Sequence, residues 1–130
     1  MTLEELEKTL PNGLHDAFLR GLNIDLAKIA MSLELDVDFS SPEDPGYKMR
    51  ACRITLSGLA FCVITPPVPK SADLYVSEEY MVARPLREVA PLPPELPPVP
   101  EGAFGYVFAT YPRNIGIFIA ARDARLDWTG

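Results

Sequence analysis

The chain has 130 residues, of which 48% are hydrophobic, and it carries a formal net charge of −6 at pH 7. This length and apolar content fit a single domain, residues 1–130, that buries roughly two-thirds of the surface its unfolded chain exposes. The acidic balance argues against a nucleic-acid-binding protein, because neutralising phosphates needs clustered lysine and arginine, and it favours a basic partner.

The N-terminal residues predict a short helix. Thr2 followed by Glu5 fits a capping box, and the leucines of this segment recur on one side of a helix. Pro11-Asn12-Gly13 must end the helix, because proline cannot continue it. The leucines concerned are Leu3, Leu6 and Leu10.

An irregular strand is predicted from Leu14 to Ile24. Arg20-Gly21 interrupts its alternation in the way that a β-bulge would. A turn near Asp25–Lys28 then leads into the next strand, so that the two strands form a predicted hairpin.

The run from Ile29 to Phe39 has the clearest pattern of the chain. Every odd position is apolar and most even positions are polar, as in a β-strand with one buried face and one wet face. No helix would place Glu34, Asp36 and Asp38 on one side and the apolar residues between them on the other. We call these three carboxylates the acidic stripe.

A second hairpin follows, because Ser40–Gly46 has the composition of a loop and the chain resumes as a strand through Cys52–Leu56. Basic residues of this strand should face the acidic stripe across the hairpin. We therefore expect the three carboxylates to pair with Lys48, Arg50 and Arg53. The acidic stripe is then a solvated, ion-paired sheet face. A cation site is the alternative.

The middle of the chain contains two further predicted strands. Gly58 marks a turn or bulge, and the apolar run Leu59–Ile64 that follows predicts a central strand. The stretch Asp73–Val82 combines features of a strand and of a helix turn, and we favour a strand.

Pro91–Pro100 contains six prolines in ten residues. Such a segment cannot donate enough amide hydrogens to join a central sheet, so we expect an extended, polyproline-like strap that crosses the surface or covers a sheet edge. Its overlapping P-x-x-P steps permit a second interpretation, as a ligand for the aromatic groove of another protein.

The last third predicts strands at Phe104–Tyr111 and Ile115–Ala121 and in a closing stretch through Leu126–Trp128. Phe104, Tyr106 and Phe108 share one strand face and should pack in the core. The whole chain is therefore predicted to be mainly β. We expect an antiparallel β-sandwich or partly open barrel of about six to eight strands, with one short N-terminal helix.

Few residues offer catalytic or ligand chemistry. The adjacent pair His15 and Asp16 could support acid–base work, since a carboxylate can orient an imidazole, but neighbours in a strand point to opposite faces. The alternative interpretation is a structural role, in which His15 or Asp16 fixes a turn by hydrogen bonds to backbone amides. Cys52 and Cys62 lie in apolar stretches without C-x-x-C spacing, which indicates buried thiols.

No pattern in the chain predicts a bound cofactor or metal ion. The single histidine and two isolated cysteines form no ligand cluster, and neither a phosphate-binding glycine loop nor a G-x-S-x-G elbow occurs. The N-terminus lacks the basic start and apolar run of a signal peptide, and no apolar run is long enough to span a bilayer. We expect a soluble cytoplasmic protein that does not contact a membrane.

Several short stretches follow one another in a characteristic order: Leu14-His15-Asp16-Ala17, Leu22-x-Ile24-Asp25, the long alternating strand, Leu56-x-Gly58-Leu59 and Ala124-x-Leu126-x-Trp128. In this order the chain resembles a loose group of small bacterial domains of unknown function, some of which resemble immunity proteins of bacterial toxin systems. The resemblance implies that His15 and Asp16 are marked positions of the group, with no role assigned to them.

The leading hypothesis is therefore a non-enzymatic protein-binding module, with immunity-like inhibition of a toxin as one form of it. The acidic balance would steer a basic protein partner, such as a nuclease-type toxin, towards this chain. One alternative is a small hydrolase or ligand-binding domain that uses His15 and Asp16 in a cleft. Another is an oligomeric structural component whose strand edges pair between copies. The candidate binding residues are His15, Asp16, Glu34, Asp36 and Asp38.

Overall fold

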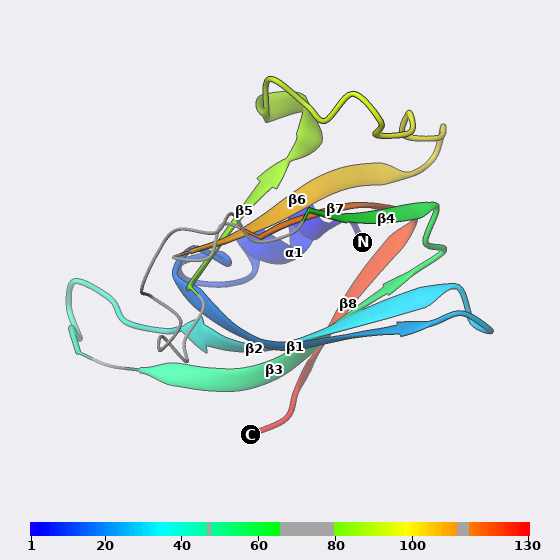
Figure 1. Ribbon diagram of the computed structural model, residues 1–130. Coiled ribbons are helices and arrows are strands. Elements are labelled where there is room, and N and C mark those ends of the chain that lie inside the picture. The colour runs from blue at the N-terminus through cyan, green and yellow to red at the C-terminus, as the bar shows by residue number, and fades with distance from the viewer. Residues whose placement is uncertain (47, 66–79, 112–114) are drawn as a thin grey trace, which may run out of the picture.

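The computed structural model describes residues 1–46, 48–65, 80–111 and 115–130 (Figure 1). The elements in chain order are α1 (Leu3–Lys8), β1 (Ala17–Asp25), β2 (Ala30–Asp38), β3 (Met49–Ser57), β4 (Phe61–Thr65), β5 (Tyr80–Pro85), the 3₁₀ helix η1 (Leu86–Glu88), β6 (Phe104–Tyr111), β7 (Gly116–Ala121) and β8 (Asp123–Trp128). Of the strand predicted over Asp73–Val82, residues 73–79 lie outside the described residues, and the remainder opens β5.

The described strands form one antiparallel sheet in the order β4-β7-β6-β5-β1-β2-β3-β8. This confirms the predicted mainly β, antiparallel fold with one short helix. Of the two predicted arrangements, the single open sheet corresponds to the partly open barrel and not to a sandwich of two separate sheets. The sheet curls, so that β1–β3 and β4, β6 and β7 lie on opposite sides of α1 (Figure 1).

The curl depends on a corner at Gly58. Strand β3 leads into β4 there, and β7 leads into β8 at Arg122, while pairing continues on both sides of the bend. Across the corner, the Arg122 amide donates to the Ser57 carbonyl over 3.0 Å. Gly58 has a φ of +63°, and a Cβ there would lie 2.9 Å from the Arg122 Cβ, so the predicted turn requires glycine.

The prediction of a central strand at Leu59–Ile64 is wrong, because β4 lies at one end of the sheet and pairs with β7 alone among the described strands. Ile64 is 49% exposed. An apolar run predicts that a strand packs against apolar side chains. The run does not predict whether the strand pairs with one neighbouring strand or with two.

The core confirms the alternation in β2. Met31 is 1% exposed, and the side chains at the next three odd positions of the strand, Leu33, Leu35 and Val37, are 0% exposed. Ile29 departs from the pattern: it has a φ of +50°, precedes the strand in the hairpin turn, and is 58% exposed. The core also contains Leu3 and Leu6 of α1 and Phe108 of β6, so one face of the helix packs against the inner face of the curled sheet, while Glu5 and Lys8 are exposed.

Two further local predictions concern the start of α1 and the bulge in β1. The predicted N-cap is confirmed, because the Thr2 hydroxyl accepts a hydrogen bond of 3.1 Å from the Glu5 amide; this is one of the two hydrogen bonds of a capping box. The register between β1 and β2 shifts between Leu19 and Gly21, where the β-bulge was predicted. The helix start and the bulge each depend on residues within a few positions of one another. Local sequence patterns can therefore predict them.

Residues 91–100 connect β5 to β6, and most of them are exposed. The side chains of Leu86 and Val99 approach Gly105 of β6, at 2.8 and 2.7 Å from the position that a Cβ would occupy. Gly105 alternates with the buried Tyr106, so this contact lies on the outer face of the sheet. The end of the proline-rich segment is therefore attached to that face, and β4 and β8, not β5 and β6, are the edges of the sheet.

The two cysteines differ in burial. Cys52 is fully buried on the inner face of β3, as predicted, whereas Cys62 on the edge strand β4 is half-buried. Burial, together with the charges of Asp36 and Glu34, raises the pKa of the Cys52 thiol to about 11. Burial also raises the pKa of Cys62.

Alkylation at pH 8 should therefore label Cys62 in the native protein and leave Cys52 unlabelled until the chain unfolds, because the reagent needs an accessible thiolate. Mass spectrometry should show one adduct per chain without denaturant and two in urea. A Cys62→Ala variant should take up no label when folded. Native labelling of that variant would contradict the burial of Cys52.

Candidate functional site

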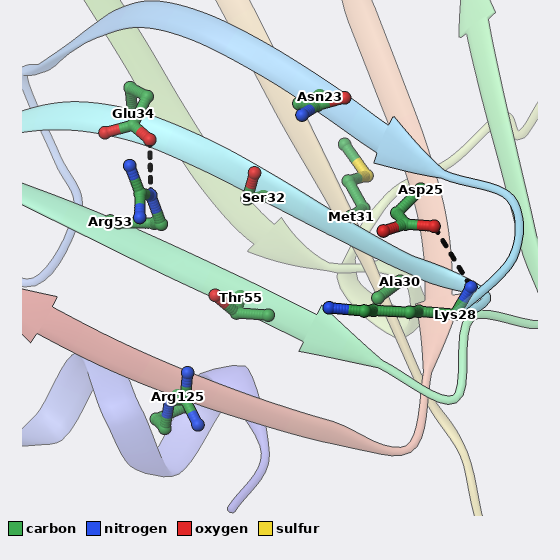
Figure 2. Close-up of a pocket in the computed structure, with 10 residues that line it drawn as sticks. All are labelled: Asn23, Asp25, Lys28, Ala30, Met31, Ser32, Glu34, Arg53, Thr55 and Arg125. Carbon is green, nitrogen blue, oxygen red and sulfur yellow. Dashed lines mark hydrogen bonds and ion pairs between the residues drawn. The ribbon is translucent and has the colours of Figure 1, made fainter.

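A groove of about 440 Å³ lies on the outer face of the sheet across β1, β2, β3 and β8 (Figure 2). Its centre is a row of side chains that stand directly opposite one another on these four strands. Asn23 pairs with Ser32, Ser32 with Thr55, and Thr55 with Arg125. We call the surface formed by this row and by the neighbouring Glu34 and Arg53 the polar groove.

The alternation of the strands places these side chains outside. Leu33 and Ile54 point into the core, so Ser32, Glu34, Arg53 and Thr55 point away from it. The bulged Gly21 stands opposite Glu34, and space above it is open because no atom lies within 4 Å of the position of a Cβ. The floor of the polar groove is thus built from short side chains on paired strands.

Ion pairs flank this row. Glu34 accepts a hydrogen bond from the directly opposite Arg53, which raises the pKa of the Arg53 guanidinium. Arg125 Nε lies 3.0 Å from Asp127 Oδ2. These pairs leave the polar groove with charges of both signs and little net charge.

The centre of the row has unused hydrogen-bonding capacity. Within the residues that the structure describes, the side chains of Asn23, Ser32 and Thr55 make no hydrogen bond, and Figure 2 shows no interaction between them. An amide and two hydroxyls can both donate and accept. The polar groove can therefore bind polar groups of a partner without first breaking internal hydrogen bonds.

Glu34 is the residue of the acidic stripe that lines the polar groove. The other two carboxylates make internal contacts. Asp36 forms an ion pair with Arg20 of β1, whose Nε lies 3.3 Å away, and Asp38 accepts a hydrogen bond of 2.8 Å from the Ser40 amide. The prediction that the stripe is an ion-paired sheet face is confirmed for Glu34 and Asp36.

Two of the predicted charge pairs are wrong. Arg50 stands opposite Val37 and its guanidinium carbon lies 4.2 Å from the centre of the Trp128 ring, a cation–π contact. Lys48 pairs with Asp44 in the preceding loop. The reason is register, since the residues of β3 that face outward with Glu34 are odd-numbered, and only Arg53 of the three predicted bases is odd-numbered.

His15 and Asp16 lie apart from the polar groove, immediately before β1. Their side chains do meet, with His15 Nε2 3.5 Å from Asp16 Oδ2, and they are 69% and 48% exposed. The expectation that they point to opposite faces is wrong, because Asp16 has a φ of +59° and precedes the strand. The Asp16 amide also donates to the Met81 carbonyl over 3.0 Å, which ties this turn to β5.

The sequence patterns missed Asn23, Ser32, Thr55 and Arg125 as site residues. Short polar side chains on a strand are common, and only their alignment across four strands distinguishes these. The first three could have been aligned from the two predicted hairpins. Arg125 could not, because it comes from a strand far along the chain.

Among the residues that the structure describes, no group of three or more His, Cys, Asp or Glu side chains could hold a metal ion. In the same residues, no helix has the length and apolar character needed to cross a membrane. Comparisons with protein-family models, curated proteins and solved structures found no match to this chain.

Proposed function

We propose that this chain is a non-enzymatic protein-binding module and that the polar groove is its binding surface. The row of Asn23, Ser32 and Thr55 carries this proposal, because these groups are aligned on paired strands and free to bond a partner. The paired strands hold the backbone of these residues in place. Binding therefore loses little conformational entropy, because few side chains have to be ordered. Protein interfaces of moderate polarity contain about one hydrogen bond per 100–200 Å².

The charge of the whole chain favours a basic partner. The polar groove itself holds both signs, so its ion pairs would set orientation, while the net charge of −6 would attract a basic protein from a distance. Immunity-like inhibition of a basic toxin, such as a nuclease-type toxin, is the form of this function that we propose. The chain would act by covering a surface of the toxin.

The test is affinity capture from the native cell lysate at low and moderate salt, using two matched variants. Thr55→Arg adds a long charged side chain to the polar groove, whereas Thr129→Arg adds the same side chain at the exposed C-terminus. We expect one stoichiometric protein to be held by the wild-type chain and by Thr129→Arg. Its affinity for Thr55→Arg should fall at least about tenfold. Equal capture by both variants would place the interface elsewhere.

The contact between His15 and Asp16 favours a second candidate, a small hydrolase or ligand-binding domain. A carboxylate 3.5 Å from an imidazole can orient it for acid–base work. Failure of the folded wild-type chain to capture any protein would count against the binding module. Hydrolase and small-ligand screens centred on His15 would then come first.

A further inference from the structure

A second groove, of about 340 Å³, lies on the outer face of the other half of the sheet, across β5, β6, β7 and β4. Its floor is a row of small side chains that stand opposite one another: Val82, Ala109, Gly116 and Thr65. The parallel row next to it contains Arg84, Val107 and Phe118. We call the surface formed by these two rows the apolar groove.

Gly116 allows neighbouring side chains to pack directly against the backbone of β7. A Cβ at this position would lie 2.9 Å from Phe118 Cε2 and 2.9 Å from Thr65 Oγ1, so no larger residue fits without displacing the phenyl ring. The aromatic edge therefore lies against bare backbone. The phenyl ring and the Thr65 hydroxyl therefore fill the space above Gly116, and the Phe118 ring itself forms the surface of the apolar groove there.

The hydroxyls at this surface are already hydrogen-bonded to the backbone. Thr65 Oγ1 accepts from the Gly116 amide over 2.9 Å, and Thr110 Oγ1 accepts from the Ile115 amide over 3.2 Å. Their polar atoms are thus engaged. What remains for a ligand is apolar contact with valine, alanine and phenylalanine side chains.

Arg84 is the exception at this surface. It is exposed and lines the apolar groove, and it forms no ion pair or hydrogen bond in the part of the chain that the structure describes. Other arginines do have carboxylate partners, namely Arg20, Arg53, Arg87 and Arg125. Two other described arginines lack a carboxylate but have a different partner, because Arg50 lies over the Trp128 ring and Arg122 donates to the Glu101 carbonyl. Among the described arginines, Arg84 is therefore the one whose guanidinium has no partner of any of these kinds.

We propose that the apolar groove binds a small carboxylate with an apolar chain, such as a medium-chain fatty acid. The apolar chain of the ligand lies across the Phe118 ring and over Ala109 and Val82, and its carboxylate pairs with Arg84. A guanidinium can bind a carboxylate through two parallel hydrogen bonds, while burial of each methylene against Phe118 and Ala109 adds affinity. The site is independent of the polar groove and does not rest on the proposed protein-binding function.

Titration of the ¹⁵N-labelled protein with decanoate, below the concentration at which it forms micelles, tests this site. Decanoate should shift the amide signals of Val82, Ala109 and Gly116 and leave those of Ser32 and Thr55 unchanged. Arg84→Gln should weaken binding by about tenfold or more, because the charge-assisted hydrogen bonds are lost. The matched variant Arg20→Gln, which removes an exposed arginine that lines neither groove, should bind decanoate as the wild type does.

Two further measurements separate charge from apolar contact. Ala109→Leu should fill the floor and weaken decanoate binding while Arg84 stays in place. Decanol, which has the same chain and no charge, should bind more weakly than decanoate and respond little to Arg84→Gln. Circular dichroism and amide spectra of each variant establish that it is folded.

The proposal is overturned by any of three results with folded proteins. Decanoate could fail to bind, it could bind equally well to Arg84→Gln, or decanol could bind as tightly as decanoate. A fourth contrary result is a dimer, detected by light scattering, whose formation protects the apolar groove and excludes decanoate. That outcome would assign the surface to a second copy of the chain.

Discussion

Replacing Glu7 by alanine is expected to destabilise the folded protein by about 2–4 kcal/mol, because one carboxylate serves two buried or half-buried donors. The Tyr106 hydroxyl donates to Glu7 Oε1, and the Leu14 amide donates to Oε2 over 3.1 Å. Tyr106 is 3% exposed, and burial together with the Glu7 hydrogen bond raises its pKa. The side chain thus joins α1 to β6 and to the segment that follows the helix.

The free energy of unfolding in urea measures this effect. Glu5→Ala, in the same helix but exposed, should change it by no more than about 0.5 kcal/mol. The double variant with Glu7→Ala and Tyr106→Phe should lose less free energy of unfolding than the sum of the losses in the two single variants. The reason is that phenylalanine has no hydroxyl that would be left without a partner when Glu7 is removed. Equal destabilisation by Glu7→Ala and Glu5→Ala would contradict the structural role of Glu7.

Replacing Leu33 by alanine should lower the free energy of unfolding by about 2–5 kcal/mol, because the change removes a fully buried side chain and leaves a cavity in the core. Leu33 lies in β2 between two paired strands, where the backbone has little freedom to collapse into the space. The midpoint of urea unfolding should fall accordingly, with the slope of the transition unchanged.

The neighbouring Ser32 is the matched control, because it occupies the same strand and points to the opposite face. Ser32→Ala should change the free energy of unfolding by no more than about 0.5 kcal/mol, as its hydroxyl has no hydrogen-bond partner among the described residues. If the two variants were destabilised alike, the assignment of the inner and outer faces of β2 would be wrong.

The two halves of the sheet have outer faces of opposite character, and this contrast separates the two proposed sites. The half formed by β1, β2, β3 and β8 presents aligned polar side chains and ion pairs. The half formed by β5, β6, β7 and β4 presents apolar side chains with Arg84 among them. The second of these outer faces is partly covered, because Leu86 and Val99 pack on β6 at Gly105.

Local sequence patterns determined the elements of this protein well. The alternation through Met31–Val37 identified the buried face of β2, the pair Thr2 and Glu5 identified the start of α1, and Gly58 marked the corner. Each of these features depends on residues within a few positions of one another. Backbone geometry and side-chain direction at that range follow directly from residue type.

The tertiary structure alone decided which strands became neighbours. It placed β8 beside β3, which brought Arg125 to Thr55, and it left the apolar β4 at an edge. It also turned Arg50 towards Trp128 and away from the acidic stripe. Such pairings join residues that are distant along the chain, and they follow from how the whole sheet closes around its core. No local pattern encodes that closure, which is why the sequence predicted the strands and Glu34 but not the groove that they form.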